Sequence, residues 1–174
     1  MKEPTPEFSY IVDLNRIPVS GLTLDLKADS EQCKALAARF DLPAIHELSA
    51  HLSFKRVNSG RVRLEAKLNA TVERICVVSL EPFSQKVEDS FSMVFVQENA
   101  SSLRLNEIDL DMGEEDEMEY PENGKTDAGE LVAESLSLAL DPFPKAPGAV
   151  FRQDAEEGEG EKNPFSVLEK LKFK

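Results

Sequence analysis

The sequence is poor in the residue types that carry most protein chemistry, with no tryptophan, two histidines and two cysteines in 174 residues. Cys33 and Cys76 have no secretory context, so we expect reduced thiols rather than a disulfide. His46 and His51 fall on opposite faces of a strand, with His46 pointing inward, which excludes a shared metal ion. No run approaches the roughly 20 apolar residues of a membrane span, and the protein is therefore expected to be cytoplasmic.

Motifs for catalysis and phosphate binding are also missing. With only eight glycines, the chain has no Walker loop, no G-x-G-x-x-G fingerprint and no G-x-S-x-G nucleophile elbow. Carboxylates are plentiful, but no partner base or pocket-forming aromatic residue selects two of them as an acid–base pair. We expect no catalytic residue, no metal, no cofactor and no enzymatic activity.

The formal net charge of −13 is unevenly distributed along the chain. Residues 1–105 are nearly neutral, whereas the acidic excess lies between residues 106 and 161. The stretch 106–126 also lacks apolar periodicity, which predicts an acidic mobile loop within a single domain covering residues 1–174. Residues 152–174 are predicted to be an acidic linker followed by a short amphipathic helix that starts at Asn163.

The middle of the chain carries the clearest strand pattern. Apolar and polar residues alternate over residues 47–54 and again over residues 62–72, and Asn58–Gly60 supplies a turn between the two runs. The second run presents one aliphatic face: Val62, Leu64, Ala66, Leu68, Ala70 and Val72. Beyond Glu73 the apolar residues change phase to Ile75 and Val77, which indicates a β-bulge or a change of sheet face.

Helix boundaries appear on both sides of this region. Asp29 or Ser30 can cap a helix that stops before Pro43, and Asp127 with Glu130 forms a capping-box-like start to a second helix. We therefore predict an α+β fold, in which an antiparallel sheet or partial barrel with a long central hairpin is covered by two or three helices.

The polar face of the hairpin is predicted to carry a basic stripe. It consists of six side chains: Lys55, Arg56, Arg61, Arg63, Lys67 and Arg74. A stripe of this kind can follow RNA phosphates, although it can also be an ordinary solvated face. It lacks the interleaved aromatic residues with which single-strand binders stack bases.

Three segments of the chain resemble a known family. They are Cys76-Val-Val-Ser-Leu-Glu-Pro82, Asp127-x-Gly-Glu130-x-x-x-Glu134-x-Leu-x-Leu138-Ala-Leu-Asp-Pro142-Phe-Pro144 and Asn163-Pro-Phe-Ser-Val-Leu168. Together they resemble the large ribosomal RNA subunit accumulation protein family, YceD, in its alphaproteobacterial type. The family-motif positions are Cys76, Leu80, Pro82, Asp127, Glu130, Glu134, Leu138, Pro142 and Pro144.

The resemblance implies a non-enzymatic bacterial ribosome-biogenesis factor that supports accumulation or processing of 23S rRNA. Many relatives have Cys-x-x-Cys where this chain has Cys76 and Ser79, and a zinc site needs four ligands, so no metal is expected here. Two modes of action remain open. The chain either binds large-subunit rRNA or its precursors through the basic stripe, or it is an adaptor that docks on a basic ribosomal protein or processing nuclease. Neither involves a membrane or a small-molecule substrate.

Overall fold

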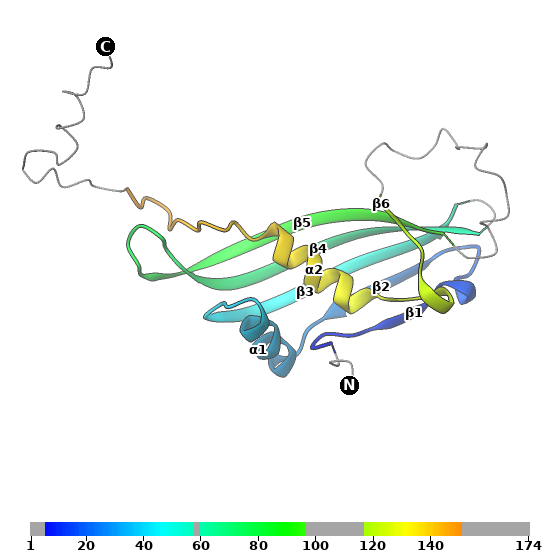
Figure 1. Ribbon diagram of the computed structural model, residues 1–174, viewed down its shortest axis with the longest axis horizontal. Coiled ribbons are helices and arrows are strands. Elements are labelled where there is room, and N and C mark those ends of the chain that lie inside the picture. Colours follow the sequence, from blue (N-terminus) through cyan, green and yellow to red (C-terminus); the bar gives the residue numbers. More distant parts are fainter. Residues whose placement is uncertain (1–5, 58–59, 97–116, 151–174) are drawn as a thin grey trace, which may run out of the picture.

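The computed structural model describes residues 6–57, 60–96 and 117–150 (Figure 1). The strands are β1 (Ile11–Asp13), β2 (Leu22–Lys27), β3 (Ala44–Arg56), β4 (Arg61–Ile75), β5 (Pro82–Val96), β6 (Glu117–Glu119) and β7 (Lys125–Asp127). The helices are α1 (Ser30–Arg39) and α2 (Ala128–Ala139), and short 3₁₀ turns occupy Leu14–Arg16 and Glu122–Gly124.

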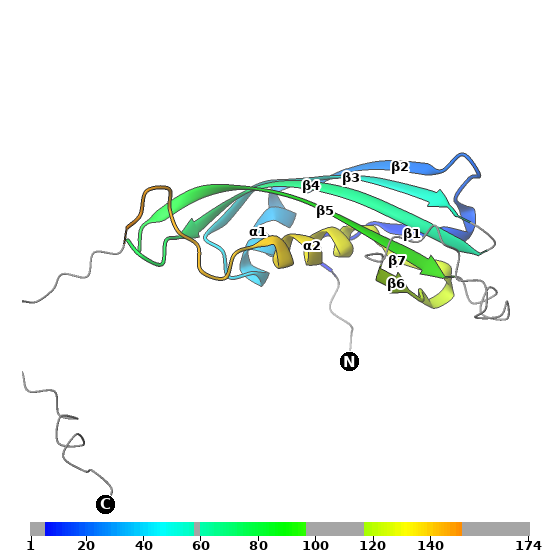
Figure 2. The same cartoon turned by 90° about the horizontal axis from the view of Figure 1, so that it is seen from above.

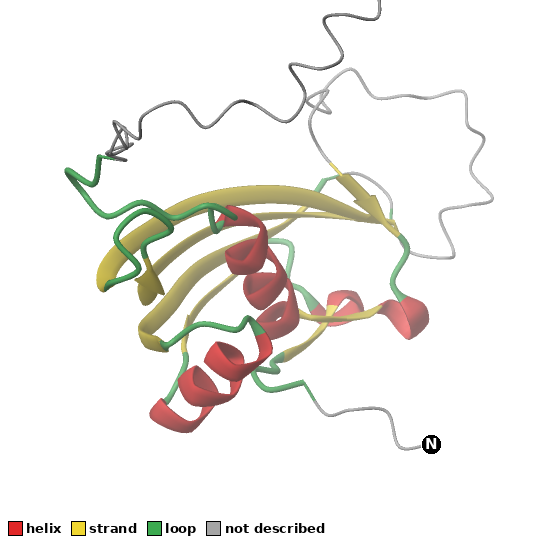
Figure 3. Ribbon diagram, turned by 60° about the vertical axis from the view of Figure 1, so that its left-hand side comes forward, coloured by secondary structure: helices red, strands yellow, loops and turns green. Residues whose placement is uncertain are grey.

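Five of the described strands form one large, open sheet. Its strand order is β2-β3-β4-β5-β6, with antiparallel pairing from β2 to β5 and parallel pairing between β5 and β6. A second, two-stranded sheet pairs β1 with β7 in antiparallel fashion. Both helices and the small sheet lie on the same side of the large sheet (Figures 2 and 3). We call that side the inner face and the opposite side the outer face.

The predicted α+β class is wrong, because the protein is mostly β. The large sheet is mixed and is not closed, and only two helices occur among the described residues. The pattern underestimated the strand content because β6 and β7 have three residues each, too few to show any alternation. These strands and a 3₁₀ turn occupy much of residues 117–126, where we expected a loop. Residues 106–116 and 152–174 lie outside the described residues.

The core lies between the inner face of the sheet and the helices. The even-numbered side chains of β4 are buried as the alternation predicted, with Leu64 at 0% and Leu68 at 1% exposure. Leu36 of α1 and Leu136 of α2 are fully buried against this cluster. Burying these aliphatic surfaces is the main favourable contribution to folding.

A β-bulge is present, but it lies in β3 and not in β4. The register between β3 and β4 shifts between Ile45 and Glu47, whereas β4 pairs with β5 without interruption. The predicted phase change after Glu73 is therefore wrong. Arg74 keeps the inward phase and is buried, while Ile75 is exposed. The extra residue in β3 also leaves His46 exposed, so its predicted inward orientation is wrong as well.

Candidate functional site

Four of the six predicted stripe residues share the outer face of the β3–β4 hairpin. Lys55 lies directly opposite Arg63 in the register, and Lys67 lies opposite His51. Lys55 and Lys67 are exposed, whereas Arg61 and Arg63 are partly buried. Three of the four, Lys55, Arg61 and Arg63, lie within a few residues of the hairpin turn. We call Lys55, Arg61, Arg63 and Lys67 the outer-face cluster.

Arg56 does not belong to this cluster. It pairs with Val62, whose side chain is buried on the inner face. Its Nε atom donates to the carbonyl oxygen of Ile17 at 2.8 Å and its Nη2 atom to that of Asn15 at 2.8 Å. Arg56 therefore fastens the N-terminal segment to the sheet and is not positioned to track phosphates.

Arg74 is also separated from the cluster. It is 8% exposed, and burial lowers the pKa of its guanidinium, partly offset by the charge of Asp141. Its Nε and Nη1 atoms are buried without a hydrogen-bond partner. A buried guanidinium cannot contact RNA at the protein surface, so including Arg74 in the predicted stripe was wrong.

The rest of the outer face is polar and carries charges of both signs. Lys55 pairs with Glu65 at 3.2 Å, and Lys27 pairs with Glu47 at 2.8 Å. Three shallow depressions of about 280, 320 and 270 Å³ share Asn69 in their lining. Cationic and acidic side chains are therefore interspersed on this face.

Two further cations, which are not among the predicted stripe residues, also face outward. Lys27 projects from β2, and Lys86 of β5 lies opposite Thr71 of β4. Both line the depressions that contain Asn69. Extending the alternation of the hairpin to the neighbouring strands would have found them.

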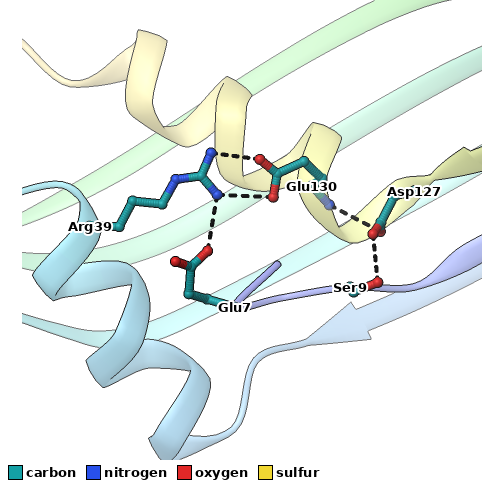
Figure 4. A network of polar contacts seen from close by, with 5 residues as sticks. All are labelled: Glu7, Ser9, Arg39, Asp127 and Glu130. Atoms are coloured by element: carbon teal, nitrogen blue, oxygen red, sulfur yellow. Dashed lines mark hydrogen bonds and ion pairs between the residues drawn. The ribbon is translucent and has the colours of Figure 1, made fainter. Parts of the chain in front are cut away.

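The motif residue Asp127 ties the start of α2 to the N-terminal segment (Figure 4). Its Oδ1 atom accepts hydrogen bonds from the backbone N–H groups of Gly129 at 3.1 Å, Glu130 at 3.3 Å and Tyr10 at 2.7 Å. Its Oδ2 atom accepts from the Ser9 hydroxyl at 2.5 Å. The predicted N-cap role of Asp127 is thus confirmed.

Glu130 does not complete a capping box. Its carboxylate instead accepts two hydrogen bonds from Arg39, from Nη1 at 3.0 Å and Nη2 at 2.6 Å. Arg39 also donates to Glu7 at 3.1 Å (Figure 4). One guanidinium therefore joins the end of α1, the start of α2 and the N-terminal segment.

Gly129 of the same motif is required by close packing. A Cβ atom on Gly129 would lie 2.5 Å from the carbonyl oxygen of Phe8, well inside van der Waals contact. Asp127, Gly129 and Glu130 thus each have a structural role at the start of α2.

The other motif segment forms a turn around the Cys76 sulfur. Sγ accepts hydrogen bonds from the N–H groups of Val78 at 3.4 Å, Ser79 at 3.4 Å and Ala146 at 3.3 Å. The pKa of the thiol is lowered to about 6, first by the Ala146 N–H group, then by the Ser79 side chain and the Ser79 N–H group. Cys76 is fully buried, but its thiol is far more acidic than that of an ordinary buried cysteine.

The Pro-rich segment packs against this turn. The carbonyl oxygen of Pro144, itself buried, accepts a hydrogen bond from the N–H group of Val77 at 2.9 Å. The contact from Ala146 to Cys76 adds a second link between the two segments. Residues 76–81 and 143–149, far apart in the sequence, therefore form one structural unit at the end of the β4–β5 hairpin.

The remaining motif positions are exposed and make little contribution to the core. Leu80 is 76% exposed and Leu138 is 87% exposed. Glu134, Pro142 and Pro82 are exposed as well. These side chains are available for contacts outside the described fold.

No group of three or more His, Cys, Asp or Glu side chains among the described residues is arranged to hold a metal ion. Neither α1 nor α2, the two helices within the described ranges, is long and apolar enough to cross a membrane.

Comparison with known proteins identifies the family. No curated protein and no solved structure matches the chain. The profile of the family described as large ribosomal RNA subunit accumulation protein YceD matches residues 64–172. This range contains most of β4, all of β5 and α2, and all three segments on which the resemblance rests. Because the match covers more than half of the sequence, the chain belongs to the YceD family.

Proposed function

We propose that the protein is a non-enzymatic ribosome-biogenesis factor that binds large-subunit rRNA, or a precursor of it, through the outer-face cluster in the cytoplasm. Membership of a family described by large-subunit rRNA accumulation supports the process. The observation that carries direct RNA contact is the register pair of Lys55 and Arg63, with Arg61 two residues before Arg63 on the same face.

Like charges directly opposite each other in a sheet destabilise it. Glu65 offsets part of this cost through its contact with Lys55 at 3.2 Å. A phosphate group bound between the two strands would also offset this cost, and arginine is well suited to bind phosphate with two parallel hydrogen bonds. We therefore expect the cluster to favour a polyanionic ligand.

The shape and chemistry of this face favour contact with the RNA backbone over contact with its bases. The small polar side chains Ser49, Asn69 and Thr71 line the shallow depressions beside the cluster. Among the described residues of the outer face, no Phe, Tyr or Trp lies between the cluster residues, although the His51 ring lies opposite Lys67. Recognition of this kind reads the shape of folded RNA and its phosphates.

A salt titration of binding to large-subunit rRNA fragments tests this proposal. With three or four phosphate contacts, log K should fall with log salt at a slope of roughly −2 to −4. Replacing Arg61, Arg63 and Lys67 by Gln should weaken binding and flatten that slope. A control with Arg16, Lys34 and Lys125 changed to Gln has the same net charge and should bind like the wild type. Equal losses in both variants, or no binding by the wild type, would contradict direct RNA contact.

A protein–protein adaptor is the second candidate function. It is favoured by α2, which exposes Leu138 and, one helical turn earlier, Glu134. An apolar side chain beside a carboxylate suits a basic ribosomal protein or a processing nuclease. Affinity purification after nuclease treatment separates the candidates. Partners that remain after treatment and are lost with Leu138→Ser support the adaptor, whereas partners lost with the RNA support direct binding.

A further inference from the structure

The end of the β4–β5 hairpin exposes a group of apolar side chains that the proposed RNA contact does not use. Val77 is 44% exposed, Leu80 76%, Phe143 68% and Val150 74%. They come from the turn after β4 and from the Pro-rich segment that is hydrogen-bonded to it. We call these four residues the apolar tip. We propose that the C-terminal segment of the same chain, residues 163–171, docks on the apolar tip.

The apolar tip is held in place before anything docks on it. The N–H group of Leu80 donates to the carbonyl oxygen of Cys76 at 2.9 Å, and that of Cys76 donates to the oxygen of Glu81 at 2.9 Å. The Cys76 sulfur accepts from both turns, and Val77 donates to Pro144. A surface fixed in this way loses little conformational entropy on binding.

Leu80 combines two features that are unfavourable in the described structure taken alone. Its φ of 59° lies in the left-handed region, which disfavours residues with a Cβ atom. Its large apolar side chain is also mostly in contact with water. Strain and apolar exposure at one residue are features of contact sites.

The position at which the described chain ends favours residues 163–171 as the segment that docks on the apolar tip. Val150, its last residue, belongs to the apolar tip, and residues 151–174 follow it directly. The stretch 151–162 spans up to roughly 40 Å when extended, which is ample for the segment after it to return to the tip. Tethering of this kind gives an effective concentration in the millimolar range, so that even a weak contact is populated.

The C-terminal sequence has the complementary chemistry. At helical spacing, Phe165, Leu168 and Leu171 would form one apolar face, and a helix this short needs a surface to be stable. Residues 162–174 are also a basic stretch in an acidic protein. The turns of the apolar tip expose Glu81 and Asp141, together with Lys145. The family profile, which matches residues 64–172, spans both the tip and this segment.

Hydrogen exchange of the full-length protein, followed by mass spectrometry, tests the docking. Amides of residues 165–171 should exchange at least tenfold more slowly than in an unstructured peptide. The double variant Leu80→Ser, Phe143→Ser should abolish this protection, and so should Leu168→Ser, Leu171→Ser. Val19→Ser, which removes an apolar side chain that is 94% exposed elsewhere, should leave the protection unchanged.

Three results would overturn the inference: no protection in the wild type, protection that survives the changes at the apolar tip, or protection that depends on protein concentration. The last result would show that a second copy supplies the contact. Near-native exchange of the β4 amides in every variant will show that the fold is intact. RNA affinity, measured on the same samples, reports on the outer-face cluster and is independent of these outcomes.

Discussion

Arg39, the last residue of α1, and Glu130, in the first turn of α2, form a two-point ion pair with Nη–Oε distances of 3.0 and 2.6 Å. Both side chains are about one-quarter to one-third exposed, at 24% for Glu130 and 34% for Arg39. The pair connects two helices that lie on the same face of the sheet but are far apart in sequence. Glu7 adds the N-terminal segment to the same contact.

Arg39→Lys should therefore destabilise the protein, because lysine cannot reproduce the planar two-point geometry. We expect a loss of about 1 kcal/mol in the free energy of unfolding, measured by urea titration. A double-mutant cycle with Glu130→Gln should give a coupling energy of about 0.5–1 kcal/mol. Strictly additive effects of the two changes would show that the pair is energetically neutral.

Gly129→Ala should destabilise the protein even though alanine is the better helix former. The propensity gain is about 1 kcal/mol, but the new Cβ atom would lie 2.5 Å from the carbonyl oxygen of Phe8 and would push the N-terminal segment away. We expect a net loss of about 1–3 kcal/mol on thermal or urea unfolding. Ser137→Ala, at an exposed position of α2, is the matched control and should be neutral or stabilising. A more stable Gly129→Ala variant would contradict this account of the motif glycine.

The two faces of β4 should respond differently to truncation. Leu68→Ala should lower the free energy of unfolding by about 2–5 kcal/mol, because Leu68 is 1% exposed within the core. Lys67→Ala, one residue earlier on the outer face, should change it by about 0.5 kcal/mol or less. Chemical unfolding of both variants tests whether Leu68 faces the core and Lys67 the solvent. Similar unfolding midpoints for the two variants would contradict this.

The Cys76 thiol should ionise near pH 6. Its three N–H donors stabilise the thiolate, whereas burial raises the pKa of Cys33. The ultraviolet absorbance of thiolate should therefore rise with a midpoint at about pH 6, remain in Cys33→Ala and disappear in Cys76→Ser.

The lowered pKa of Cys76 determines how the free energy of unfolding changes with pH. The folded pKa of Cys76 lies below that of an unfolded cysteine, which is about 8.5, so the unfolded chain binds more protons between these values. The contribution of this ionisation to stability is fully present above about pH 8.5 and is lost as the pH falls through 6. The rise in stability between these pH values should be smaller in Cys76→Ser. An unchanged pH profile would show that the thiol is not ionised in the folded protein.

The sequence predicted the hairpin well because its signal is local. With six aliphatic residues in strict alternation from Val62 to Val72, a one-residue slip would expose all of them, so the buried face is fixed. The start of α2 was also predicted from a local signal, because aspartate is a preferred N-cap residue and Asp127 directly precedes the helix. The position of Glu130 in the first turn of α2 was predicted, but its ion pair was not, because Arg39 lies in another helix.

The misplaced residues, His46, Arg56 and Arg74, lie near the ends of β3 and β4. The bulge lies in β3, so β4 continues its phase and carries Arg74 inward, while His46 turns outward. Arg56 bonds to the carbonyl groups of residues 15 and 17, about 40 positions earlier in the chain. Alternation does not reveal these carbonyl partners, but it places Arg56 and Arg74 in phase with the buried Phe54 and Val72. Continuing it to the strand ends would have removed both residues from the predicted stripe.

The pairing of β1 with β7 has a consequence for how the protein forms during its synthesis. Residues 11–13 cannot find their partners until residues 125–127 have left the ribosome. At about 5–20 residues per second, this delay is on the order of ten seconds. The antiparallel meander from β2 to β5 can assemble meanwhile through contacts between successive strands. During this time β1 of the nascent chain remains without its partner strand, and the small sheet forms only after β7 has emerged.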